Sequence, residues 1–263
     1  MKKAIATLMV FALITTLLSG CVGPLRAPSK AEEGKTQQEK PAGSQQNNNL
    51  SMEPAIVESW AIGCSAILAT KWGVDPHNYG MFDKNDKDAA ATARTVLSRD
   101  WGISSRADLI ELIERMTDGG HSSEFAEVYE AVASLSDAEY AELLEYAEGI
   151  ESYMWPLTKS LGEKWGDRQI KAWDWFRMIH IIGWGYHAGY LELEEAYSMM
   201  IPVIERLSST FSSWDEANEN YLDGYAWWSM TDVGDPNSEY KNRVKIYESL
   251  KDDSTLYNPL LWQ

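Results

Sequence analysis

Apolar side chains recur at helical spacing through most of this chain. In residues 105–120, for example, the apolar side chains stand three or four positions apart, which places them on one face of an α-helix. A serine precedes this run and two glycines end it, as helix start and stop signals do. The strict alternation of a half-buried β-strand hardly appears. The pattern therefore predicts an all-α fold. The apolar positions of this example are Leu109, Leu112, Ile113 and Met116.

The same signals divide the chain into about nine predicted helices joined by short loops. Pro54 lies in the first turn of the first helix, and a glycine ends that helix. Ser136 and Glu139 have the spacing of a capping box, and Pro202 predicts a kink inside a later helix. The segments share no common period, so we expect one non-repeating domain and not a solenoid. The predicted helices cover 54–73, 88–103, 105–120, 122–135, 136–150, 167–185, 193–211, 213–228 and 237–253.

The first residues have the layout of a secretory signal. Lys2 and Lys3 precede an apolar run at 4–18, which is short for a membrane-spanning helix. The next residues complete the sequence LSGC, which resembles a bacterial lipobox and ends at Cys21. This resemblance implies a lipoprotein signal peptide at 1–20, cleavage before Cys21, and attachment of fatty acyl chains such as palmitate to that cysteine. The alternatives are an ordinary signal peptide cut elsewhere and an uncleaved anchor.

A tether and a larger domain follow the signal. Residues 21–52 are rich in Pro, Gly, Ser, Gln, Asn and charged residues and lack apolar periodicity, which predicts a disordered tether. Residues 53–263 then form the all-α domain. Several acyl chains on Cys21 would hold the protein firmly on a membrane of the cell envelope. We expect the outer membrane in a Gram-negative host and the outer face of the plasma membrane in a Gram-positive host.

The charge of the chain narrows the class of partner. Its formal net charge is −17. The first fifty residues hold six basic and three acidic side chains, so the domain alone carries about −20. Such a surface repels nucleic acid phosphates and anionic lipid head groups. We therefore expect no nucleic acid partner and attribute the acidity to solubility.

Cysteine and histidine usage gives little support to a reactive or metal centre. Once Cys21 is acylated, Cys64 is the one thiol left in the sequence, and its apolar surroundings predict a buried, inert side chain. Histidines are few, and they form neither a His-Glu-x-x-His motif nor a pair four residues apart. We predict no metal site and no cofactor. The ligands weighed for a metal were His121, His180, His187 and Asp174.

The stretch 172–190, AWDWFRMIHIIGWGYHAGY, places charged residues in the most apolar predicted helix. Asp174 and Arg177 stand three residues apart, a spacing at which an ion pair forms readily on a helix. His180 follows one turn later, and Trp173 adjoins the pair. Because a buried charge is costly unless it is paired, one interpretation is structural, in which the pair ties this helix to a loop or to the end of another helix.

The other interpretation of this polar cluster is a functional pocket. In it, Asp174, Arg177 and His180 serve as acid, base or anion clamp. Exposure of the three side chains decides between the two interpretations. A trio that opens into a cleft favours an enzyme, and a trio covered by Trp173 and Trp214 favours a structural role.

Several landmarks resemble the uncharacterised bacterial family called domain of unknown function 1266. They include the stretches CSAIL, GGHSSEF, AWDWFR and YNPLLW, and the resemblance covers most of 60–263. Glu192 departs from the small capping residue expected there, which affects the start of the helix that follows. The family carries no activity that the resemblance could transfer. Its motif positions here are Ala172, Trp173, Asp174, Arg177, Gly185, Tyr186, Gly189, Tyr190, Glu194, Glu195, Ala196, Ser213, Trp214, Glu216, Gly224 and Trp228.

Three hypotheses for function remain open at this point. The first is a membrane-anchored lipoprotein whose acidic helical domain is a binding or interaction module of the cell envelope. The second is a hydrolase that acts on an envelope component through the Asp/Arg/His cluster. The third is a glycan-binding module, because the chain holds 12 Trp and 13 Tyr and exposed rings can stack on sugars. The sequence does not identify the protein or glycan partner.

Overall fold

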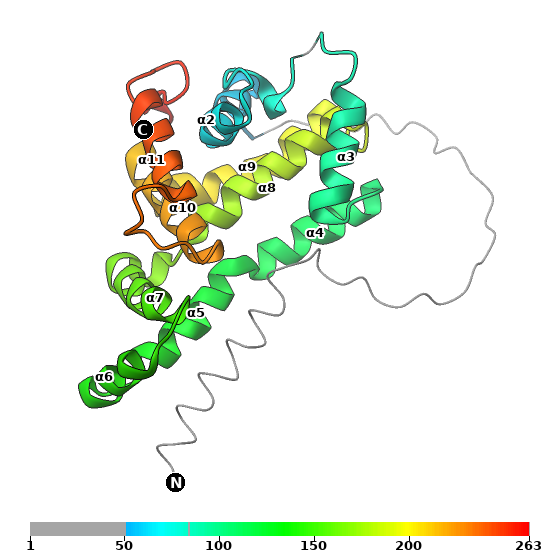
Figure 1. Cartoon of the computed structure of the whole chain (residues 1–263). Helices are drawn as coiled ribbons and strands as arrows, with labels where there is room; N and C mark the ends of the chain where they lie inside the picture. The colour runs from blue at the N-terminus through cyan, green and yellow to red at the C-terminus, as the bar shows by residue number, and fades with distance from the viewer. Residues whose placement is uncertain (1–50, 84, 263) are drawn as a thin grey trace, which may run out of the picture.

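Helices make up the regular structure of the part of the chain that is described, residues 51–83 and 85–262, in which no strand occurs. The structure is a computed structural model (Figure 1). It confirms the all-α prediction for these ranges. The predicted signal peptide, the lipidation site Cys21 and the tether as far as residue 50 lie outside the described residues.

The α-helices begin shortly after the tether and continue almost to the C-terminus. Three short 3-10 helices join them: η1 (Tyr79–Met81), η2 (Gly166–Arg168) and η3 (Pro259–Trp262). The α-helices are α2 (Pro54–Trp72), α3 (Ala89–Trp101), α4 (Arg106–Asp118), α5 (Gly120–Ala133), α6 (Asp137–Tyr146), α7 (Glu151–Trp165), α8 (Lys171–His187), α9 (Leu193–Thr210), α10 (Trp214–Trp228) and α11 (Glu239–Leu250).

Each predicted helix corresponds to a helix of the structure, but α7 was not predicted. Its sequence contains Pro156 and Gly162, both of which usually interrupt helices. Packing explains why Gly162 belongs there. A Cβ atom at this position would lie 2.1 Å from the ring of Tyr129, so the glycine lets α7 approach α5 closely.

Side-chain caps begin four of the helices. The predicted capping box is present at α6, where Ser136 and Glu139 bond to each other's backbone N–H. Ser105, Ser213 and Ser238 cap α4, α10 and α11 in the same way as Ser136. Helix α9 begins without a side-chain cap, and Glu192 occupies its N-cap position. It then continues through Pro202 as one helix.

Helix α8 is the central element of the fold. It packs against α2, α3, α4, α5, α9, α10 and η1, and Figure 1 shows it running through the middle of the molecule beside α9. All but one of its residues from Ala172 to Gly185 are buried. The shared surface of α8 and α10 is especially close, because a Cβ on Gly224 would lie 2.3 Å from the Cβ of Trp173.

Within the described residues, no helix is both long and apolar enough to cross a bilayer.

Replacing Gly224 with alanine tests the close contact between α8 and α10. A Gly-to-Ala change inside a helix ordinarily stabilises by about 0.5–1 kcal/mol. Here the new methyl group overlaps the Cβ of Trp173, so we expect Gly224→Ala to lower the free energy of unfolding by about 1–3 kcal/mol in urea denaturation. The control Glu205→Ala, at an exposed position of helix α9, should change it by less than about 0.5 kcal/mol. A stabilised Gly224→Ala variant would contradict the packing argument.

Candidate functional site

Asp174 caps the N-terminus of another helix. Its carboxylate accepts the backbone N–H of His121 at 3.1 Å and of Ser122 at 2.7 Å, both in the first turn of α5. Helix α5 begins with two glycines, which have no side chain to do this themselves. Gly120 has a φ of +66°, and a Cβ there would lie 2.7 Å from the Asp174 carboxylate. A negative charge at this position also complements the helix dipole.

Arg177 contacts both the capping carboxylate of Asp174 and the first turn of α5. Its Nη1 lies 3.5 Å from Asp174 Oδ1 and 2.8 Å from His121 Nδ1. Three tryptophan rings surround the guanidinium, with centroids 4.7, 4.7 and 5.8 Å from its central carbon. The rings belong to Trp101, Trp173 and Trp228.

His180 does not join this pair. Its Nε2 donates to the backbone carbonyl of Cys64 in α2, at 3.0 Å. Burial, which the hydrogen bond to this carbonyl only partly offsets, lowers the pKa of His180 to about 4. The side chain is therefore neutral at physiological pH and fastens α2 to α8. Cys64 itself is buried, as predicted, and burial raises the pKa of its thiol well above the usual value.

The trio is covered. Asp174, Arg177 and His180 are 2%, 9% and 1% exposed. Trp173 packs on the Arg177 guanidinium, whereas Trp214 lies elsewhere, against Trp60. By the exposure criterion, the geometry matches the structural interpretation of this cluster.

The electrostatics of Asp174 agree with a fixed anion. Burial raises the pKa of its carboxyl, but contact with the His121 ring, the Arg177 charge and the Ser122 N–H together bring the pKa below its usual value. The group thus stays ionised at neutral pH and cannot donate a proton. In residues 51–83 and 85–262, no three His, Cys, Asp or Glu side chains gather closely enough to hold a metal ion. His187, for example, bonds to the carbonyl of Tyr79 at 2.9 Å.

A hollow with a volume of about 350 Å³ lies at the start of α10. This C-terminal hollow combines an aromatic floor with a polar rim. Trp214 and Tyr257 are each 5% exposed and form the floor. The half-buried Trp262 lies beside them, with its ring centroid 5.5 Å from that of Trp214. The other residues around the hollow are Ser212, Ser213, Asp215, Lys251, Asp252, Ser254 and Pro259.

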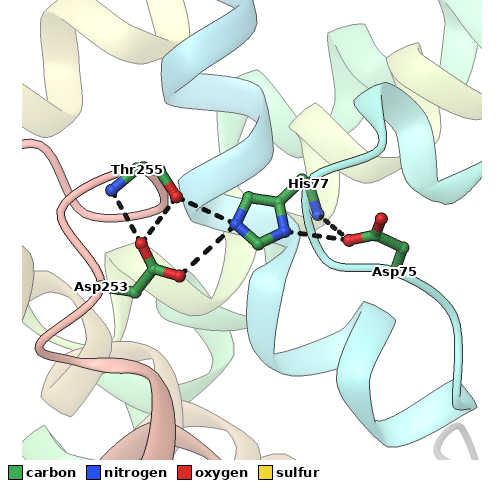
Figure 2. Close-up of polar contacts among 4 residues, drawn as sticks. All are labelled: Asp75, His77, Asp253 and Thr255. Carbon is green, nitrogen blue, oxygen red and sulfur yellow. Dashed lines mark hydrogen bonds and ion pairs between the residues drawn. The ribbon is translucent and has the colours of Figure 1, made fainter.

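A cluster around His77 borders the same C-terminal loop (Figure 2). His77 Nδ1 lies 2.9 Å from Asp75 Oδ1, and its Nε2 lies 2.9 Å from the Thr255 hydroxyl and 3.4 Å from Asp253. The order Asp, His, Thr resembles a hydrolase triad. In such a triad the hydroxyl donates its proton to the histidine. Here the Thr255 hydroxyl donates to Asp253 at 2.6 Å instead. The cluster therefore acts as a clasp between the loop after α2 and the loop after α11.

The structure places Asp174, Arg177 and Trp173 in contact, as the sequence predicted. The hollow and the clasp were not predicted. The aromatic stretch YNPLLW was noted only as a landmark, yet it supplies Tyr257 and Trp262. Aromatic residues after a strongly charged terminal helix were the one available signal. The hollow forms where this segment meets the start of α10. These two segments are far apart in the sequence, so no short-range pattern predicts their contact.

The described residues form an all-α domain in which Asp174 of α8 caps the N-terminus of α5. The chain belongs to the family described as "Protein of unknown function (DUF1266)", whose model matches residues 96–263. The match begins inside α3, so it leaves out α2, which the sequence resemblance had included from about residue 60.

Two relatives come from Escherichia coli (strain K12). Uncharacterized protein YbeR is 30% identical over 178 residues, which cover 64% of this chain and 75% of YbeR. Uncharacterized protein YbeU is 27% identical over 164 residues, which cover 62% of this chain and 69% of YbeU. No solved structure matches the chain.

Removing the carboxylate of Asp174 should strongly destabilise the domain. Asp174→Ala leaves the first N–H groups of α5 uncapped and the buried Arg177 charge unpaired, which costs about 3–5 kcal/mol. For a domain of this size we expect a fall in Tm of about 6–20 °C by circular dichroism. Asp118→Ala, which removes an exposed carboxylate at the end of α4, is the control and should leave Tm nearly unchanged. Equal Tm values for the two variants would refute the capping role.

The buried His180 should make stability depend on pH. The unfolded chain takes up this proton near pH 6.5 and the folded chain only near 4, so stability is full above 6.5 and falls as pH drops toward 4. The loss amounts to about 3 kcal/mol. His180→Gln keeps a donor for the Cys64 carbonyl but does not titrate. Its unfolding free energy, measured in urea from pH 7 to 4, should fall by about 3 kcal/mol less than that of the wild type. Parallel curves would show that His180 is not the titrating group.

Proposed function

We propose that this protein is a lipid-anchored binding module of the cell envelope. Acyl chains on Cys21 would hold it on the membrane, and the acidic helical domain would bind a partner at a distance set by the tether. The lipobox-like sequence at Cys21 supports the anchor. The observation that carries the binding role is the C-terminal hollow, with its aromatic floor and polar rim, which is the usual composition of a small-ligand site.

The hydrolase hypothesis has less support. It relied on Asp174, Arg177 and His180 lining a pocket, but each of these side chains is buried and committed to another helix. A general acid or base must reach its substrate within hydrogen-bond distance. Asp174 could do so only if α5 lost its cap.

The glycan-binding hypothesis is supported in a changed form. It predicted a flat row of exposed rings. The strongly exposed aromatic residues of the described ranges are Trp72, at 43%, and Tyr146, at 68%, and they lie on the separate helices α2 and α6. Aromatic side chains gather instead around the C-terminal hollow. A concave aromatic site favours a small ligand over a long flat polymer.

The anchor is tested by metabolic labelling with radioactive palmitate in a bacterial host. The wild type should carry the label and sediment with membranes, because acylation makes membrane binding strong. Cys21→Ser should lose the label, whereas the matched control Cys64→Ser should keep it, since Cys64 is buried in the domain. Label retained by Cys21→Ser, or absent from the wild type, would refute the lipid anchor and leave the binding role to be judged separately.

A further inference from the structure

We propose that the C-terminal hollow binds a neutral saccharide of one or two sugar units and that the His77 clasp holds the hollow in shape. This inference rests on the proposed binding role and names its ligand class and its site. The volume of about 350 Å³ lies at the lower end of the range of about 300–1,000 Å³ for small-ligand sites. A ligand of one or two rings fits this size.

The aromatic ring that the hollow can offer to the apolar face of a sugar is that of the half-buried Trp262, because Trp214 and Tyr257 are each 5% exposed. Trp214, Tyr257 and Trp262 meet there, and Trp262 is the most exposed of the three. Contacts with neighbouring segments fix the position of the Trp214 ring. Trp214 donates its indole N–H to the Asn258 carbonyl at 3.1 Å. Gly63 of α2 also gives it room, because a Cβ there would lie 2.5 Å from the Trp214 ring. Fixed aromatic side chains bind a ligand with little loss of entropy.

The rim suits the hydroxyl groups of a sugar. Ser212, Ser254 and Asp252 are exposed side chains that can accept or donate hydrogen bonds. Asp215 lies at the start of α10 and already accepts a hydrogen bond from the Tyr247 hydroxyl, so its second carboxylate oxygen is the acceptor left for a ligand. Hydroxyl and carboxylate groups beside aromatic rings match a ring that carries hydroxyls at its edge and C–H groups on its face.

The charge of the site selects against anionic sugars. Among the residues of the hollow, Asp215 and Asp252 are acidic and Lys251 is basic. Lys251 is already paired with Glu248, whose carboxylate lies 2.6 Å from its Nζ. The domain around the hollow carries a net charge of about −20. A uronic acid would therefore be repelled where the matching neutral sugar is not.

The clasp and the hollow share one loop. Lys251, Asp252 and Ser254 line the hollow, while Asp253 and Thr255 of the same loop contact His77. Figure 2 shows His77 between this loop and Asp75. The loop thus contributes residues both to the hollow and to the clasp. His77 is a positioning residue, because it holds the rim without touching the ligand.

The test is calorimetric titration of the full-length lipoprotein, purified in a detergent without a sugar head group. The probes are glucose, N-acetylglucosamine, its β-1,4-linked dimer and glucuronic acid. We expect at least one neutral probe to bind with a Kd of about 1 mM or tighter and to change tryptophan fluorescence. Glucuronic acid should bind at least tenfold more weakly than the tightest-binding neutral probe. Equal binding of these two, or heat from none of the probes, would overturn the proposal.

Variants locate the site. Trp262→Ala and Ser254→Tyr should each weaken binding at least tenfold, the first by removing floor area and the second by filling the hollow from the rim without altering the core. Trp72→Ala, which removes an exposed ring on α2, should bind as the wild type does. His77→Ala should weaken binding severalfold while the wild-type melting curve is retained. Equal affinities for Ser254→Tyr and the wild type would show that sugar binds elsewhere, and release of reducing ends from the dimer would replace binding by hydrolysis.

Discussion

The fold depends on the pairing of polar side chains of buried helices with backbone groups of neighbouring segments. Asp174 of α8 caps α5, and Asn220 of α10 caps α8, since its amide accepts the N–H of Ala172 at 2.9 Å and donates to the Gln169 carbonyl at 2.7 Å. His180 then bonds to α2. Buried polar groups without partners are costly, so these contacts are satisfied together only when the helices stand in one register. Apolar packing alone would leave the helices freer to slide.

This arrangement also explains why charges persist in the most apolar helix. A well-packed apolar pair could replace a buried ion pair without loss of stability in many proteins. Here the carboxylate of Asp174 does more than pair with Arg177, because it completes a helix that starts with two glycines. Those glycines are required in turn, since a side chain at Gly120 would occupy the place of the carboxylate. The stretches GGHSSEF and AWDWFR, which are far apart in sequence, thus form one structural unit.

The limits of sequence reasoning follow from the range of the interactions. Caps and apolar periodicity are local, so they located helices such as α4 and α6 with their serine caps. Helix α7 was missed because Pro156 and Gly162 both argue against a helix in the sequence, and the contact with Tyr129 of α5 that requires Gly162 leaves no local pattern. The ion pair of Asp174 was predictable from spacing. His180 stands three residues from Arg177 on α8, but its ring bonds to the carbonyl of Cys64 in α2, a contact between helices that spacing along α8 does not show.

Three of the motif positions that carry the resemblance to the family have structural roles. Trp173 covers Arg177, Ser213 caps α10, and Gly224 admits Trp173. A family signature of this kind identifies a fold without identifying a reaction. The C-terminal hollow differs, because its rim lies on exposed loop residues whose identity the core does not dictate. Trp214 belongs to both, with its ring in the core and its edge at the hollow. Under the proposed function, the choice of ligand would therefore depend on these rim residues and not on the core.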